Sequence, residues 1–155
     1  MSETIKQKIE RAGKAFDEIS DYTQEQVDKL IYEAGKIIYQ NAAKLAEMAV
    51  NETGLGDVNE KILKNEETGA VFWEYLKDKK SVGIINPEPD EDGLSKVAHP
   101  VGVMAAITPA TNPTITPLGN FMQALKGKNA MIVSPAPRAQ KTSYESCMLI
   151  REALV

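Results

Sequence analysis

The residues best suited to chemistry lie in two short loops, each directly after an apolar run. The first loop, residues 108–113 (TPATNP), follows the apolar run 101–107 and contains Asn112. A side-chain amide on a rigid loop can donate a hydrogen bond to a developing oxyanion. Asparagine also caps helices well, and here it precedes Pro113. Taken alone, these residues favour the capping role.

The second loop, residues 134–138 (SPAPR), follows another apolar run, residues 130–133. Ligands of open α/β sheets bind beyond the carboxyl ends of the strands, so two such loops should face one cleft. The chain contains no GxGxxG fingerprint. The residues alone therefore leave the ligand unspecified, and a rigid loop without a ligand stays an alternative for SPAPR.

The segments around these loops predict a βαβ unit. Residues 101–107 are almost uninterruptedly apolar, which is typical of a parallel strand that is covered on both faces. Residues 114–125 carry apolar side chains at helical spacing, with Pro113 suited to the first helical position. Residues 130–133 form the second strand, and a final helix should run from residues 138–142 to Val155.

The preceding part of the chain predicts three helices. Residues 3–19 form an amphipathic helix, which we expect to dock on its own domain, with a docking tag for a partner protein as the alternative. Thr23, with Gln26 at the capping-box position, should start a long helix that ends near Glu52. A third helix should span residues 58–79, with an interruption or a bend at Gly69.

Two short strand candidates follow, residues 81–86 and 94–98. They flank a Pro/Asp/Gly-rich loop, residues 87–93, and predict a hairpin.

Two stretches of the chain resemble a known family. PVGVMAAITPATNP and KNAMIVSPAPRA are similar to the cofactor-binding domain of aldehyde dehydrogenases, and most similar to the branch that acylates coenzyme A. The resemblance implies an α/β fold in which N-terminal helices lead into part of a Rossmann-like cofactor-binding domain. Residues 1–155 would be the N-terminal part of the NAD(P)-binding domain, divided into a helical segment (1–79), a hairpin excursion (80–98) and a βαβα core (99–155).

The resemblance also implies the chemistry. In the family, the asparagine that matches Asn112 stabilises the oxyanion formed when a cysteine thiolate attacks the aldehyde, and this reverses the preference for a capping role. The cofactor would be NAD or NADP, with coenzyme A as co-substrate and a small aldehyde as substrate. The implied cofactor-binding residues are Ile107, Thr108, Pro109, Ala110, Thr111, Ser134, Pro135, Pro137 and Arg138.

The second loop departs from the hydrolytic members of the family, which carry lysine and glutamate there. This chain has Ser134 and Pro137 at the matching positions, as in the acylating branch. That branch more usually reads SPHPRA, and Ala136 replaces its histidine. Any contact specific to that ring is therefore not expected here.

Cys147 and His99 are the only residues of their types. Cys147 shares one helical face with Ser143, Ile150 and Leu154, so it should pack as a small hydrophobe. The family's cysteine nucleophile belongs to a catalytic domain beyond Val155, so we expect residues 1–155 alone to be inactive. His99 is expected at an exposed strand edge, and no metal site is predicted, because a lone histidine has no second ligand.

Composition limits the partners. The chain has 155 residues, a net charge of −4 and no basic patch interleaved with aromatic residues, so nucleic acid is not expected as a partner. No stretch has the roughly 20 apolar residues that span a bilayer. A single cysteine and no signal-peptide pattern predict a cytoplasmic protein, and we expect the full-length protein to be a homo-oligomer.

Two other interpretations stay open. The chain could be a truncated, non-catalytic scaffold or interaction module, or part of a hydrolytic aldehyde dehydrogenase that uses water in place of coenzyme A. Acetaldehyde, succinate semialdehyde and sulfoacetaldehyde types of substrate all fit the sequence.

Overall fold

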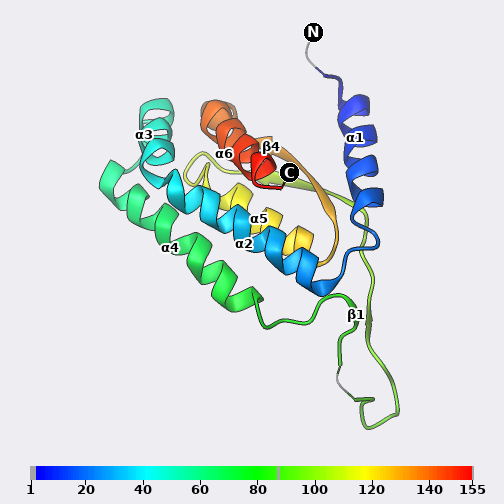
Figure 1. Cartoon of the computed structure of the whole chain (residues 1–155). Helices are drawn as coiled ribbons and strands as arrows, with labels where there is room; N and C mark the ends of the chain where they lie inside the picture. The colour runs from blue at the N-terminus through cyan, green and yellow to red at the C-terminus, as the bar shows by residue number, and fades with distance from the viewer. Residues whose placement is uncertain (1–2, 87, 155) are drawn as a thin grey trace.

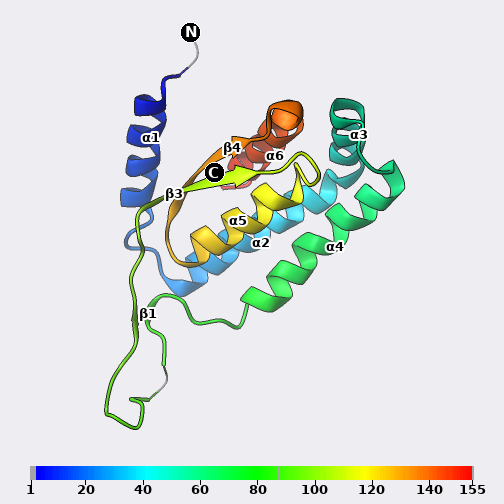
Figure 2. The same ribbon diagram turned by 180° about the vertical axis from the view of Figure 1, so that it is seen from behind.

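A parallel pair of strands lies between one helix on one side and a group of helices on the other (Figures 1 and 2). The computed structural model describes residues 3–86 and 88–154. The strands are β3 (Val103–Thr108) and β4 (Ala130–Pro135), and α1 (Ile5–Glu18) contacts both of them. On the other side, α5 (Ile115–Lys126) contacts both strands and α6 (Gln140–Glu152) contacts β4. The predicted α/β fold is confirmed.

The remaining elements complete the helical side and form a separate hairpin. They are α2 (Gln24–Gln40), α3 (Ala42–Thr53), α4 (Val58–Leu76), the short 3-10 helix η1 (Pro137–Ala139), and the strands β1 (Gly83–Ile84) and β2 (Val97–Ala98).

The βαβ unit is confirmed. Strands β3 and β4 pair in parallel, with Ile107 opposite Ser134 and Thr108 opposite Pro135. Helix α5 begins at Ile115, with Thr114 in the N-cap position. The prediction that Pro113 occupies the first helical position was therefore wrong by two residues, because residues 113 and 114 form a turn before the helix.

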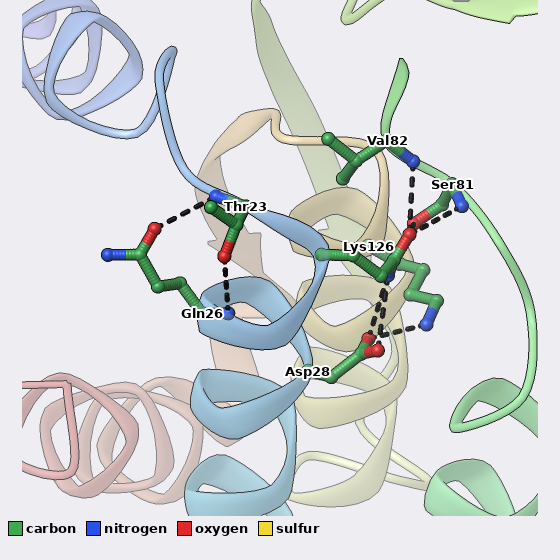
Figure 3. Close-up of polar contacts among 7 residues, drawn as sticks. Thr23, Gln26, Asp28, Ser81, Val82 and Lys126 are labelled. Atoms are coloured by element: carbon green, nitrogen blue, oxygen red, sulfur yellow. Dashed lines mark hydrogen bonds and ion pairs between the residues drawn. The ribbon is translucent and has the colours of Figure 1, made fainter. Parts of the chain in front are cut away.

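The predicted long second helix is two helices, α2 and α3, so that prediction was wrong. The start is correct: Thr23 and Gln26 form the capping box, as Figure 3 shows. The break is at Asn41, whose φ of −108° and ψ of 17° are not helical. Its side-chain amide donates to the carbonyl of Ile37 at 2.9 Å. Asparagine competes in this way with regular helical bonding, although the apolar face continues through both helices.

Gly69 does not interrupt α4, which runs unbroken through it. Its backbone instead contacts Gly35 of α2, since a Cβ atom on Gly69 would lie 3.2 Å from the carbonyl oxygen of Gly35. The glycine therefore permits two helices to approach closely. The hydrophobic core includes residues of α2, α3 and α5, namely Val27, Ile31, Ile38, Leu45, Leu118 and Met122.

Strand β3 is not covered on both faces, contrary to the expectation from its apolar sequence. Met104 is 41% exposed and Ile107 is 85% exposed. Within the described ranges 3–86 and 88–154, β3 pairs only with β4, which leaves its other edge open. An open groove of about 570 Å³ is lined by residues of β3 and α5, together with Met131 of β4.

The hairpin is confirmed, but its strands are shorter than predicted. Gly83 pairs with Ala98, and Ile84 pairs with Val97. Beyond these pairs the side chain of Asn86 links the two segments. Its Oδ1 accepts from the Lys96 amide at 2.6 Å, and its Nδ2 donates to the Leu94 carbonyl. The hairpin extends away from the rest of the molecule (Figures 1 and 2). Pro87, at the start of the predicted loop, lies outside the described residues.

Helix α1 rests on the strands without being buried by them. None of its residues is buried, and Ile5 and Ile9 are 70% and 52% exposed. The expected docking of α1 on its own domain is thus confirmed, but α1 contacts the strands without burying any of its residues. The last helix, α6, ends at Glu152, and Val155, its expected end, lies outside the described residues. Among the described helices, none is long and apolar enough to cross a membrane.

A polar network joins the start of α2, the end of α5 and the segment before β1 (Figure 3). Lys126 and Asp28 form an ion pair at 2.5 Å, with side chains that are only 7% and 19% exposed. Gln24 donates to both Asp28 oxygens and accepts from the amides of Ser81 and Val82. This network fixes the direction in which the chain leaves the helices for the hairpin.

Candidate active site

The two loops expected to carry function lie side by side at the carboxyl ends of β3 and β4. Because the strands pair in parallel register, the loop of residues 108–113 and the loop of residues 134–138 begin at the same edge. The Ala136 amide donates to the Thr108 carbonyl at 2.9 Å, which links them directly. Both loops thus begin at one edge of the sheet, and the common cleft expected between them stays a prediction.

Asn112 is half-buried, and its side chain does not cap α5. The N-cap residue is Thr114, and no side chain makes the cap hydrogen bond. Instead, Asn112 Oδ1 accepts from Lys64 Nζ at 3.1 Å. Lysine is only a donor, so this contact fixes which way the amide faces. Within the described part of the chain Nδ2 makes no hydrogen bond, so it is free to donate to a ligand.

Two lysines of α4 hold this loop, and sequence reasoning missed both. Lys61 Nζ donates to the Thr111 carbonyl at 2.9 Å. Thr111 directly precedes Asn112, whose side chain Lys64 contacts. A small cavity beside them is also lined by Thr114. Burial, and then the positive charge of Lys64, lower the pKa of Lys61. Their i, i+3 spacing, which puts both on one helix face, was the available signal.

The second loop is held by the end of α3. The Arg138 guanidinium donates to the Thr53 carbonyl at 2.6 Å. The Glu52 carboxylate accepts from the amides of Lys141 and Thr142 and from the Thr142 hydroxyl, each at 2.8 Å. Glu52 thus supplies the cap that the start of α6 lacks locally, where Ala139 occupies the N-cap position. No local sequence signal predicts contacts between segments this far apart.

The exposed side of this loop carries hydrogen-bond donors. Ser134 is exposed, so its hydroxyl can bond a ribose hydroxyl, and Pro135 and Pro137 restrict the backbone. Arg138 uses one guanidinium nitrogen for Thr53, which leaves further N–H donors of the kind that bind phosphate.

Neither Cys147 nor His99 offers the chemistry of an active site. Cys147 is half-buried on α6, and burial raises the pKa of its thiol to about 11. The thiol is therefore protonated near neutral pH and is a poor nucleophile. The expected packing of Cys147 as a small hydrophobe is seen only as partial burial. His99 is exposed, and residues 3–86 and 88–154 hold no group of three or more His, Cys, Asp or Glu side chains placed to bind a metal.

Glu52 gives the first testable prediction. Burial opposes ionisation, but the hydrogen bonds from Thr142 and Lys141 outweigh it and lower the pKa of Glu52. A carboxylate with a lowered folded-state pKa stabilises the protein fully above its unfolded pKa of about 4.3, and loses that effect as pH falls through the folded pKa. We expect Glu52→Gln to lower the free energy of unfolding by about 1 kcal/mol at pH 7, after allowance for solvent screening.

Urea unfolding of both proteins between pH 7 and pH 3 measures this effect. The difference between wild type and Glu52→Gln should shrink below about pH 4. The matched control is Glu47→Gln, which removes an exposed carboxylate from the same helix. Equal effects of the two substitutions at every pH would contradict the capping role of Glu52.

Comparison with known proteins shows the family of the chain. The model of the aldehyde dehydrogenase family matches residues 1–155. The chain belongs to the aldehyde dehydrogenase family. It is 45% identical over 151 residues to a succinate-semialdehyde dehydrogenase (acetylating) of Clostridium kluyveri, covering 97% of this chain and 33% of that protein. It is also 45% identical over 153 residues to a sulfoacetaldehyde dehydrogenase (acylating) of Bilophila wadsworthia, with the same coverage.

Solved structures of acylating aldehyde dehydrogenases share the fold. An acetylating aldehyde dehydrogenase from Geobacillus thermoglucosidasius matches with a TM-score of 0.89 and 37% identity, over 94% of this chain and 32% of that one. A Rhodopseudomonas palustris propionaldehyde dehydrogenase with bound propionyl-CoA matches with a TM-score of 0.83 and 30% identity, over 98% and 33%. An engineered glycolyl-CoA reductase with bound NADP+ matches with a TM-score of 0.79 and 28% identity, over 98% and 34%.

These comparisons confirm the predicted resemblance to acylating aldehyde dehydrogenases. The chain spans about a third of the length of the curated aldehyde dehydrogenases it matches. They do not test the individual site residues, so the roles of Asn112 and of the second loop stay predictions.

Proposed function

We propose that the chain is the N-terminal part of an NAD(P)-dependent, coenzyme A-acylating aldehyde dehydrogenase. In the complete enzyme, an aldehyde, coenzyme A and the oxidised cofactor would give acyl-coenzyme A and the reduced cofactor. The observation that carries the proposal is Asn112, placed at the end of β3 with its amide oxygen held by Lys64 and its amide nitrogen left without a partner in the described part of the chain. That is the geometry of a preorganised donor.

Asn112 acts where negative charge develops. When a thiolate adds to the aldehyde carbon, a C–S bond forms and the carbonyl oxygen becomes an oxyanion, which accepts a hydrogen bond from Asn112 Nδ2. The positive charge of Lys64 at Oδ1 polarises the amide and strengthens this donor. The thiolate does not come from Cys147, whose pKa is raised by burial to about 11.

The second loop would position the cofactor. Bound NAD(P) supplies a hydride acceptor, and bound coenzyme A supplies the thiol that accepts the acyl group. In this proposal residues 1–155 are part of the NAD(P)-binding domain, with the exposed Ser134 hydroxyl and the Arg138 guanidinium beside the adenosine ribose. The two ligand-bound relatives, one with propionyl-CoA and one with NADP+, support the use of both compounds.

The substrate would be a small aldehyde. Two relatives act on succinate semialdehyde and sulfoacetaldehyde by name, and each of these aldehydes carries a negative charge. We also propose a homo-oligomeric full-length protein, and its cytoplasmic location stays a prediction.

Product analysis of the full-length protein tests the proposal. With succinate semialdehyde and NAD or NADP, we expect reduced cofactor and acyl-coenzyme A, identified by mass spectrometry, only when coenzyme A is present. Residues 1–155 alone serve as the negative control and should form neither product, because Cys147 is not a competent nucleophile. Free acid formed at the same rate without coenzyme A would instead assign the hydrolytic reaction. No cofactor reduction with any aldehyde would favour the non-catalytic scaffold.

A further inference from the structure

Two positive charges meet beside Asn112 without a negative charge to balance them. Lys61 and Lys64 reach the main-chain oxygen of Thr111 and the side-chain oxygen of Asn112, at 2.9 Å and 3.1 Å. Carboxylates lie one turn away along α4, at Asp57, Glu60 and Glu67. Among the described residues, none of these carboxylates comes within ion-pair distance of either lysine.

This arrangement costs free energy in the absence of a ligand. Partial burial of Lys61, and then repulsion by the charge of Lys64, lower the pKa of Lys61. Lys64 is exposed, so a ligand can reach it. Thr114, which lines the same cavity, has a buried hydroxyl that makes no hydrogen bond within the described part of the chain. The cavity of about 10 Å³ has room for no more than a water molecule. An anion would therefore meet the lysines at the exposed side of Lys64, where it would offset the repulsion between them.

We propose that Lys61 and Lys64 bind the anionic group of the aldehyde substrate, and so select short aldehydes that carry a carboxylate or a sulfonate. This inference rests on the proposed function of Asn112. The aldehyde oxygen must lie at Asn112 Nδ2, while the ammonium groups lie at the same residue and the one before it. One methylene in sulfoacetaldehyde and two in succinate semialdehyde separate the aldehyde from the anionic group. That group therefore stays within a few bond lengths of Asn112, the residue that Lys64 contacts.

A phosphate of the cofactor is the competing anion. Both lysines hold the loop with Asn112, whereas the predicted nucleotide loop, residues 134–138, is held by Thr53 and by Glu52 through the start of α6. Lys61 contacts Thr111, which is itself among the predicted cofactor-binding residues, so the KM for NAD(P) in the lysine variants distinguishes the two anions.

The test uses the full-length enzyme and compares matched aldehydes. The kcat/KM values for succinate semialdehyde and sulfoacetaldehyde are each divided by the value for butanal, which is neutral and of similar length. We expect Lys61→Gln and Lys64→Gln each to lower this ratio by about fivefold, and the double variant to lower it further. Lys64→Arg, which keeps the charge, should retain most of the ratio. The control Lys29→Gln removes one exposed charge from α2, outside the cavity, and should leave the ratio unchanged.

Butanal separates this inference from the proposed function. Lys64→Gln keeps a donor for Asn112 Oδ1 but loses the charge that polarises the amide, so turnover of butanal should fall without being abolished. This loss is shared by all aldehydes and cancels in the ratio. Coenzyme A-dependent turnover with an unchanged ratio in both variants would overturn the role of the lysines and leave the enzyme assignment intact. A raised KM for NAD(P) or coenzyme A in place of the aldehyde would assign the lysines to a cofactor phosphate and also overturn the inference. The ratio for each anionic aldehyde shows which headgroup is preferred.

Discussion

Replacing Asn112 with alanine in the full-length enzyme is expected to lower kcat by about 100-fold to 1000-fold and to leave the KM for NAD(P) nearly unchanged. The amide nitrogen makes its catalytic hydrogen bond only when the aldehyde oxygen becomes negative, so its removal raises the barrier and not the binding constant. Steady-state rates of cofactor reduction at saturating aldehyde and coenzyme A measure the effect.

Stability should hardly change in this variant, because the side chain of Asn112 bonds only to exposed Lys64 among the described residues. Thermal unfolding of Asn112→Ala checks this point. The matched control is Asn51→Ala, an exposed asparagine on α3 without a side-chain hydrogen bond in the described structure, which should keep full activity. Unchanged kcat in Asn112→Ala would remove Asn112 from the mechanism.

The second large effect is expected at the ion pair between Asp28 and Lys126. Asp28→Asn should lower the free energy of unfolding by about 3 kcal/mol, because it leaves the ammonium of Lys126 nearly buried without a negative partner. Gln24, which donates to both Asp28 oxygens, also loses charged acceptors. Urea denaturation at pH 7 measures the loss.

A double variant separates charge from shape at this site. Adding Lys126→Met to Asp28→Asn removes the uncompensated charge, so most of the lost stability should return. Glu33→Gln, which breaks the exposed pair with Lys36, should have a much smaller effect. If Asp28→Asn lowered the free energy of unfolding no more than Glu33→Gln, the network in Figure 3 would contribute little to stability.

Features that depend on neighbouring residues could be predicted from the sequence. The Thr23–Gln26 capping box, the hairpin and the parallel βαβ unit each follow from short patterns, and each is confirmed. Features that depend on tertiary contacts could not. The apolar pattern continues past Asn41, so hydrophobic periodicity does not indicate that the helix ends there. The contact between Gly69 and Gly35 joins two different helices, so no local pattern indicates it.

The same distinction applies to the candidate site. The two loops follow apolar runs, so their place at one sheet edge was predictable from topology. Lys61 and Lys64 were missed because the third helix was interpreted through its apolar residues alone. Glu52 caps the start of α6, in a contact that no local pattern indicates. The exposure of Ile107 contradicts the expected burial. An apolar sequence indicates that a strand can be buried, but it does not show which element would cover it.

The central claim is that one loop holds the reacting oxygen and the adjacent loop holds the nucleotide. A crystal structure of the full-length protein with NAD(P) and a thioacyl intermediate tests it most directly. We expect Asn112 Nδ2 at about 3 Å from the acyl oxygen, with the adenosine ribose beside Ser134 and Arg138. An Asn112 side chain turned towards the start of α5, or a ribose bound away from residues 134–138, would contradict the account.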